Sequence, residues 1–427
     1  MADGIGTRLR AVRRARGLTQ KEIAEPRFSS AYVSTIEAGR RRPSSAALSH
    51  FASKLGIDPD ELATGRPADL EPRLELSIAE ARSLLFSGKV QEAESLLASV
   101  RSEAARHGAA ALEARALESL GRIEERRGHL NDATALYDEA IELLWEEPPT
   151  LSTEAIAGKA RCVQMNGDVR YAIHLLESHI DRLKRESLQD PLALMRLQSS
   201  LVWPYLEVGL NEKASVAANT ALELEARVEN PEQVASMHMN VARELLRRGR
   251  PQQALDSLRK AEGLYDLLDY QTEVARAHIN RGIVLRERGD LDAARAELLS
   301  AVDTFERTEM RLEWARSLNE LARLERLAGH EELAKRLLHK AIDALRDSAM
   351  PELGLAYREL ALCDFESDPN RAEKHLLTAV DLFGRCDQDI QLAETYRWLG
   401  DLRSSRGDDD AARTTYREGL LLVTGRS

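Results

Sequence analysis

A motif that recurs about every 40 residues is the strongest constraint on the fold of this 427-residue chain. In each copy an alanine follows a glycine by five residues, and an apolar or small residue stands four positions later. A serine replaces the glycine in one copy, and successive copies are 38 to 42 residues apart: Gly88, Gly128, Gly167, Gly209, Gly249, Gly289, Gly329, Ser367 and Gly407. A fixed period with glycine between two amphipathic stretches predicts a helical solenoid, in which each glycine allows a tight turn.

Further residues indicate the kind of helical repeat. Leu120-Gly121, Leu399-Gly400 and Tyr137 stand where the tetratricopeptide repeat (TPR) consensus has Leu-Gly and an aromatic residue. Armadillo and HEAT repeats share a period near 40 residues, but the glycine-to-alanine spacing favours TPRs with longer helices. Residues 74–427 therefore resemble an array of about nine TPRs. The resemblance implies a right-handed superhelical solenoid whose concave face carries the first helix of each pair.

Composition agrees with an all-α chain and narrows its chemistry. Hydrophobic residues make up 43% and charged residues 31%, so a core can form, while aromatic residues reach only 4%. The three cysteines, Cys162, Cys363 and Cys386, lie far apart, which predicts reduced thiols and no metal site. No phosphate-binding loop, HExxH or GxSxG motif is present, so we expect neither a cofactor nor enzymatic activity.

The sequence also predicts a cytoplasmic protein that does not enter a membrane. The N-terminus lacks the pattern of a signal peptide. No apolar run approaches the roughly 18 residues that cross a bilayer.

Charge is distributed unevenly along the chain. Residues 1–66 contain 12 Lys and Arg against 7 Asp and Glu, a net charge of +5. Residues 67–427 contain 48 against 64, a net charge of −16. A basic head on an acidic body suggests that only the head approaches nucleic acid phosphates.

The basic head reads as five short helices within residues 1–65. They are expected at residues 5–16, 19–25, 30–38, 46–55 and 60–63. Thr19 and Glu22 form a capping box at the start of the second helix, and Pro26 ends it. Residues 66–73, with two prolines, read as a linker and hinge to the repeat array.

Two short helices across a tight turn in a basic segment are typical of a helix-turn-helix. Three segments carry a more specific similarity: residues 18–24 (LTQKEIA), 32–40 (YVSTIEAGR) and 42–44 (RPS). Over about 60 residues the head resembles the lambda-repressor/Cro (XRE) type of DNA-binding domain. It departs from the common pattern in the turn at residues 26–28, which lacks the usual glycine and is one residue shorter.

The resemblance implies that the third helix enters the major groove of double-stranded DNA. Gln20 is expected to contact a phosphate or to brace this helix, and Tyr32 is either a base reader or part of the core. Arg40, Arg41 and Arg42 follow in the next loop, where they can meet phosphates. The predicted DNA-binding residues are Gln20, Ser29, Ser30, Ala31, Tyr32, Ser34, Thr35, Arg40, Arg41 and Arg42.

Polar residues recur at the concave positions of the predicted array. Asn240 and Asn280 share a register in adjacent repeats, and an amide side chain suits a peptide backbone because it both donates and accepts. Arginine suits a carboxylate, such as a peptide C-terminus. The predicted ligand-binding residues are Arg196, Trp203, Asn240, Arg243, Arg276, Asn280, Arg316, Asn319 and Arg323.

An XRE-type head on a TPR body resembles the RRNPP family of quorum-sensing peptide receptors and the helix-turn-helix/repeat regulators of actinobacteria. The resemblance implies a homodimer on a palindromic operator and a transcription regulator whose DNA affinity responds to a peptide or small ligand. One alternative is an interaction scaffold that holds a partner protein and uses the head as an accessory tether. Another is a phage or defence-island repressor with the same head.

Overall fold

The computed structural model describes residues 4–67, 69–186, 188, 190–345, 350–386 and 388–424. Within these ranges the regular structure is entirely helical, so the predicted all-α class is confirmed. No helix in the described part of the chain is both long and apolar enough to cross a membrane.

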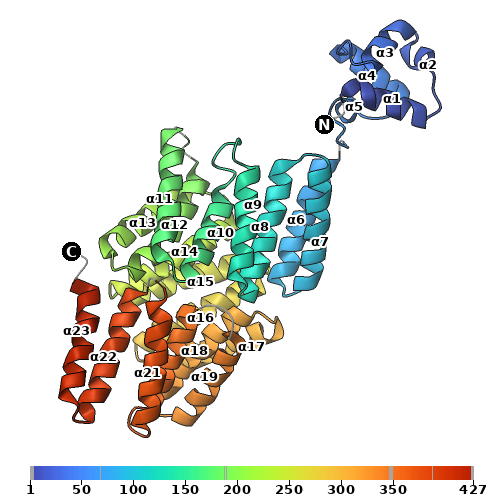
Figure 1. The fold of residues 1–427 in the computed structure, drawn as a ribbon. Helices are drawn as coiled ribbons and strands as arrows, with labels where there is room; N and C mark the ends of the chain where they lie inside the picture. The colour runs from blue at the N-terminus through green and yellow to red at the C-terminus, as the bar shows by residue number, and fades with distance from the viewer. Residues whose placement is uncertain are drawn as a thin grey trace.

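The first five helices form a small domain, drawn in blue in Figure 1, and they match the predicted ones to within one residue at every end. The capping box is present, since Thr19 accepts from the backbone of Glu22 and Glu22 accepts from the backbone of Thr19. The five helices are α1 (Ile5–Ala15), α2 (Gln20–Ala24), α3 (Ser30–Glu37), α4 (Ser45–Leu55) and α5 (Pro59–Thr64).

In the described part of the chain, the remaining helices form nine consecutive antiparallel pairs, which confirms the predicted helical solenoid. A short 3₁₀ turn, Glu225–Arg227, follows the fourth pair. The pairs are α6 (Leu70–Phe86) with α7 (Val90–Arg106), α8 (Ala110–Arg127) with α9 (Leu130–Leu143), α10 (Thr153–Met165) with α11 (Val169–Arg185), α12 (Pro191–Glu207) with α13 (Asn211–Leu224), α14 (Pro231–Arg247) with α15 (Pro251–Leu267), α16 (Gln271–Glu287) with α17 (Leu291–Arg307), α18 (Arg311–Leu327) with α19 (Glu331–Leu345), α20 (Met350–Asp364) with α21 (Pro369–Gly384), and α22 (Asp389–Ser405) with α23 (Asp409–Thr424).

The recurring motif has a direct structural role. All eight of its glycines adopt φ between +68° and +101°, a left-handed conformation that side chains with a Cβ rarely take. The nine alanines that follow are at most 2% exposed, because the two helices of a pair lie closest there: Ala93, Ala133, Ala172, Ala214, Ala254, Ala294, Ala334, Ala372 and Ala412.

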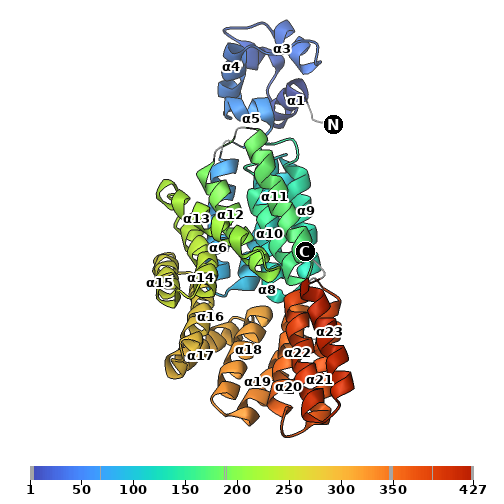
Figure 2. The ribbon, with the colours of Figure 1, turned by 90° about the vertical axis from the view of Figure 1, so that its left-hand side faces the viewer.

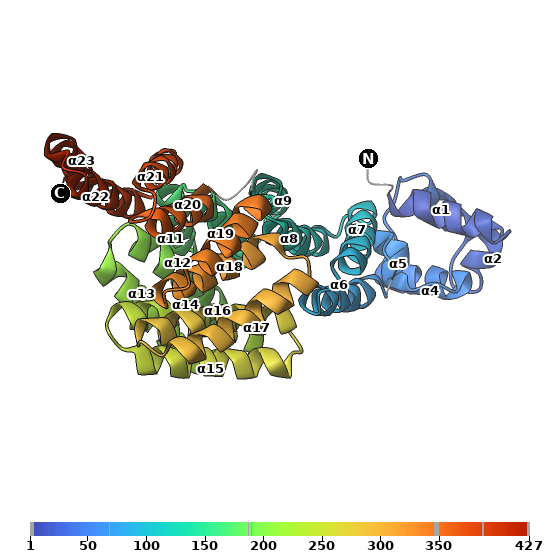
Figure 3. The same cartoon turned by 90° about the horizontal axis from the view of Figure 1, so that it is seen from below.

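The solenoid winds tightly enough for its early helices to contact later ones. Helix α6 touches α16, and α8 touches α18, so that one hydrophobic core joins α6–α8 with α16–α18. The Phe86 ring stacks on Tyr270 with 3.9 Å between centroids. Figures 1 and 3 show α16–α19, in yellow to orange, brought beside α6–α8.

The connection between head and body is shorter than expected. Helix α6 begins at Leu70, inside the predicted linker 66–73, and Leu70 is fully buried in the body. Arg66 also binds the body, donating to the backbone oxygens of His107 and Gly108. Figure 2 shows the connection between α5 and the body; Ala68 lies outside the described residues, as do residues 425–427 at the predicted end of the array.

Candidate DNA interface and ligand cavity

The two helices of the helix-turn-helix are held together by a compact apolar core. Ile23 and Ala24 of α2 and Val33 and Ile36 of α3 are at most 1% exposed. They pack with residues of α1, α4 and α5, among them Phe51.

A buried ion pair, not anticipated from the sequence, fixes α3 relative to α1. Arg13 donates from Nε and Nη2 to the two carboxylate oxygens of Glu37, at 2.6 and 2.9 Å. Burial opposes ionisation of Glu37, but hydrogen bonds from Arg13 and Gln20 outweigh it and hold its pKa below the usual range. Arg13 lies four residues after the buried Leu9 and therefore on the apolar face of α1. An arginine at that position could have indicated a buried ion pair.

Gln20 contacts the C-terminal end of α3, the helix that the resemblance places in the major groove. Its amide nitrogen donates to Glu37 Oε2 at 2.8 Å. Because Glu37 is at the C-terminal end of α3, Gln20 and Arg13 together hold that end of the helix.

The N-terminal part of α3 presents small polar side chains to solvent. Ser30, Ala31 and Ser34 are exposed. Ser29 caps the helix by accepting from the backbone of Tyr32, and Thr35 donates to the carbonyl of the same residue. These residues therefore form a face that a major groove can receive, with the hydroxyls of Ser29 and Thr35 already bonded to the helix backbone.

Tyr32 takes an intermediate position between the core and the surface. Its ring stacks on Phe28 at 5.5 Å and lies 6.3 Å from Phe51, which ties it to the domain core. Its hydroxyl accepts from the backbone of Ser44. The side chain is half-buried: it packs against the domain core and is still partly accessible to solvent.

Arg40, Arg41 and Arg42 are all exposed in the loop after α3. The Arg41 guanidinium lies 5.0 Å from the Tyr32 ring centroid. This contact places one cation of the loop beside the exposed face of α3, where phosphates that flank a groove would lie.

The concave side of the body forms a partly open cavity of about 1180 Å³, a volume that includes its solvent-filled mouth. Its walls come mainly from the first helices of the pairs, α6 to α18, as the resemblance to TPRs implied. Six of the nine predicted ligand-binding residues line it: Arg196, Trp203, Asn240, Arg243, Arg276 and Asn280.

The other three predicted residues lie outside the cavity lining and bind neighbouring helices. Arg316 forms an ion pair with Glu352 at 2.8 Å and stacks on the Trp203 ring at 5.0 Å. Asn319 donates to the Glu352 carbonyl at 3.1 Å. Arg323 lies 3.7 Å from Glu359.

A network of ion pairs covers one side of the cavity and was not foreseen. Arg122 bridges Glu154 at 2.5 Å and Glu232 at 2.9 Å, and Arg196 reaches Glu154 at 2.7 Å. This network joins α8, α10, α12 and α14. Its charged groups contact one another in place of water. Arg82 also pairs with Glu232, and further ion pairs beside the network join Arg126 with Glu273, Arg161 with Glu125, and Arg276 with Glu273.

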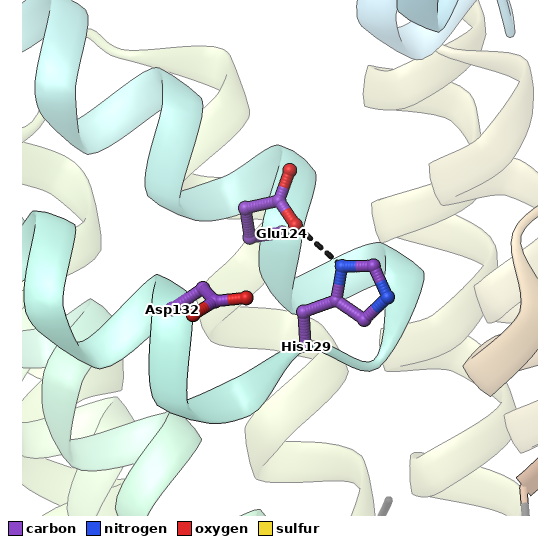
Figure 4. A group of neighbouring side chains, drawn as sticks. All are labelled: Glu124, His129 and Asp132. Carbon is purple, nitrogen blue, oxygen red and sulfur yellow. Dashed lines mark hydrogen bonds and ion pairs between the residues drawn. The ribbon is translucent and has the colours of Figure 1, made fainter. Parts of the chain in front are cut away.

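A second cluster lies on the surface at the turn between α8 and α9 (Figure 4). Potential ligand atoms of Glu124, His129 and Asp132 come within 4.8 Å of one another. His129 Nδ1 is 2.6 Å from one oxygen of Glu124, and Arg127 donates to the other oxygen at 2.6 Å. The arginine beside the Glu124 carboxylate opposes the binding of a cation there.

Comparisons with known proteins agree with this division into head and body. Residues 5–64 match the helix-turn-helix domain family. A 69-residue stretch is 41% identical to the uncharacterized HTH-type transcriptional regulator y4dJ of Sinorhizobium fredii, and the match covers 87% of that protein and 16% of this chain.

The body is similar in fold to a solved Rap protein complexed with competence and sporulation factor. The similarity has a TM-score of 0.59 at 13% identity and covers 83% of this chain and 98% of that one. The apo form of the quorum sensor NprR from B. thuringiensis is 15% identical over 83% of this chain and 100% of that one, with a TM-score of 0.48, too low to support a structural argument. From the sequence match and the geometry of its head, the chain belongs to the HTH-type transcriptional regulators, and it joins that head to a TPR body.

Proposed function

We propose that this DNA-binding regulator senses a peptide or small ligand in the cavity of its TPR body and that the ligand alters operator binding. The carrying observation is the cavity on the concave face, which brings together six of the predicted ligand-binding residues from α12, α14 and α16. Concave cavities in which a few polar groups converge are the usual sites of small ligands.

The mechanism needs two body shapes with different ligand affinity, because a ligand shifts an equilibrium only by that difference. We propose that two chains associate and present two heads to a palindromic operator in the cytoplasm. A change in the winding of the body then changes the spacing of the heads, and with it the affinity for half-sites at a fixed separation.

The test measures DNA binding of the full chain by fluorescence anisotropy on a fragment recovered by genomic footprinting. The ligand source is the low-molecular-weight fraction of a cell extract. We expect this fraction to change the Kd of wild type, and Asn240→Ala with Asn280→Ala to abolish the change while sparing DNA binding without extract.

The matched control is Asn131→Ala with Asn211→Ala, because both residues are exposed and neither lines the cavity. An unchanged response in the Asn240/Asn280 variant would remove these residues from the ligand site. A wild-type Kd that no extract fraction alters would contradict the sensing function itself.

A further inference from the structure

One wall of the cavity carries polar side chains that make no hydrogen bond or ion pair to any residue that the structure describes. Ser236, Asn240 and Arg243 of α14 are spaced by four and three residues and therefore share one helix face. All three line the cavity. Among the residues that the structure describes, none accepts or donates a hydrogen bond to these side chains.

Arg243 is exceptional among the arginines of the cavity. Six arginines line it, and five have a carboxylate within 4 Å: Arg122, Arg126, Arg161, Arg196 and Arg276. Within the described ranges, Arg243 has no such partner. The acids whose charge it feels are engaged elsewhere, since Gln164 donates to Glu207 and Arg316 pairs with Glu352.

Contacts with neighbouring side chains hold the Arg243 guanidinium in place, but none of the described ones supplies a carboxylate to pair with its charge. The guanidinium lies over the Trp203 ring, 3.6 Å from its centroid, and Arg316 approaches the same ring. Burial, followed by the nearby charge of Arg316, lowers the pKa of Arg243 to about 9. Stacking uses the face of the guanidinium and leaves the N–H donors at its edge for an acceptor.

From this arrangement we infer that the α14 wall is an anion subsite, in which Arg243 binds a carboxylate or phosphate of the ligand. Asn240 and Ser236 bind polar groups one and two turns further along the same helix. This inference rests on the proposed ligand sensing and adds the chemical class of the ligand. The anionic group belongs either to a small free acid or to the C-terminus of a short peptide, since a carboxylate is common to both.

The test uses probes that differ in charge but little in shape. Thermal unfolding of the full chain is followed with benzoate, phenyl phosphate and neutral benzamide at constant ionic strength. A pentapeptide with a free C-terminus and its C-terminal amide form the second arm. We expect at least one anion to raise the Tm, and benzamide and the peptide amide to leave the Tm unchanged. A shift with the small acids indicates a free acid as the ligand, and a shift with the peptide indicates a peptide C-terminus.

Arg243→Gln keeps hydrogen-bonding capacity and removes the charge. We expect it to weaken binding of the active anion at least tenfold. Because the variant removes a half-buried charge that no carboxylate neutralises, its Tm without ligand should equal or exceed that of wild type, whereas a purely structural cation would lower Tm on removal. Arg247→Gln is the matched control, because Arg247 is exposed on the same helix and does not line the cavity.

The inference is overturned if no anion shifts Tm, if benzamide acts like benzoate, or if Arg243→Gln binds as wild type does. DNA binding measured on the same samples separates this inference from the proposed function. An Arg243-dependent Tm shift without any change in operator Kd supports the subsite and contradicts sensing by it. An extract-dependent change in Kd that Arg243→Gln leaves intact supports sensing and contradicts the subsite.

Discussion

Glu118 of α8 is a buried acid in an environment that disfavours its charge. Burial, reinforced by the nearby Glu154 carboxylate, raises its pKa to about 8, although Arg196, Arg82 and Arg122 oppose the shift. One of its carboxyl oxygens has no hydrogen-bond partner. The folded protein therefore holds a proton that the unfolded chain releases near pH 4.5.

This acid predicts a stability that falls as pH rises. Between about pH 4.5 and 8 the folded state binds more protons at Glu118 than the unfolded state, so this group destabilises the fold progressively. The slope is at most about 1.4 kcal/mol per pH unit for one proton. Glu118→Gln should gain stability over wild type across this window in urea unfolding, with no further gain above it. A difference that does not vary with pH would contradict the assignment.

Single residues show the reach of sequence reasoning. A local motif determines that Tyr32 lies in α3 and that Gln20 begins α2, beside the end of α3. The Arg13–Glu37 pair and the lone Arg243 were not foreseen as such, because a charge partner from a distant helix leaves no local pattern. Arg243 was expected in the cavity, but its lack of a partner becomes visible only when every neighbour is in place.

At the scale of elements, close helix approach depends on glycines inside the helices as well as in the turns. A Cβ at Gly158 of α10 would lie 2.4 Å from the Tyr137 ring, and Tyr137 is only 1% exposed. A Cβ at Gly263 of α15 would meet no described atom within 4 Å beyond the backbone of its own helix and its two chain neighbours. Both glycines thus lie in α-helices, but Gly158 packs tightly against a ring and Gly263 faces open space.

Gly158→Ala should destabilise the protein by roughly 1–3 kcal/mol, because the buried ring has little room to yield. Gly263→Ala should instead stabilise it by about 0.5–1 kcal/mol, since alanine favours a helix and nothing opposes the added methyl. Chemical denaturation of both variants measures the difference. Equal effects would show that helix propensity alone, and not the Tyr137 contact, governs these positions.

The helices themselves were largely predictable. Turn glycines at a constant spacing indicated nine pairs, and capping residues located the helices of the head, because both signals are local. The start of α6 was misjudged: Pro72 suggested a linker, yet proline is tolerated in the first turn of a helix.

At the scale of the whole molecule, contacts between successive windings hold the body closed. Glu232 at the start of α14 accepts from Arg82 of α6 and from Arg122 of α8, each at 2.9 Å. Arg126 of α8 binds Thr272 and Glu273 of α16. A repeat pattern describes each pair and its neighbours, so this closure over some 110 to 150 residues was not predictable.

Glu232→Gln should loosen this closure. It removes the charge that two arginines share and should cost roughly 1–3 kcal/mol, as for hydrogen bonds to charged groups. Small-angle X-ray scattering should show a larger radius of gyration than for wild type. Glu229→Gln, at an exposed position three residues earlier, is the control; indistinguishable scattering from the two variants would contradict a closing role for Glu232.

The central claim is that the basic head makes the whole molecule a sequence-specific regulator and not a scaffold with a DNA tether. The most direct measurement compares the Kd of the full chain for its footprinted fragment with the Kd for a shuffled fragment, at salt concentrations from about 50 to 200 mM. Binding through phosphate contacts alone loses much of its affinity over this range. We predict a preference for the native fragment of about 10³ or more that persists at the highest salt. Equal affinities that collapse together as salt rises would contradict the account.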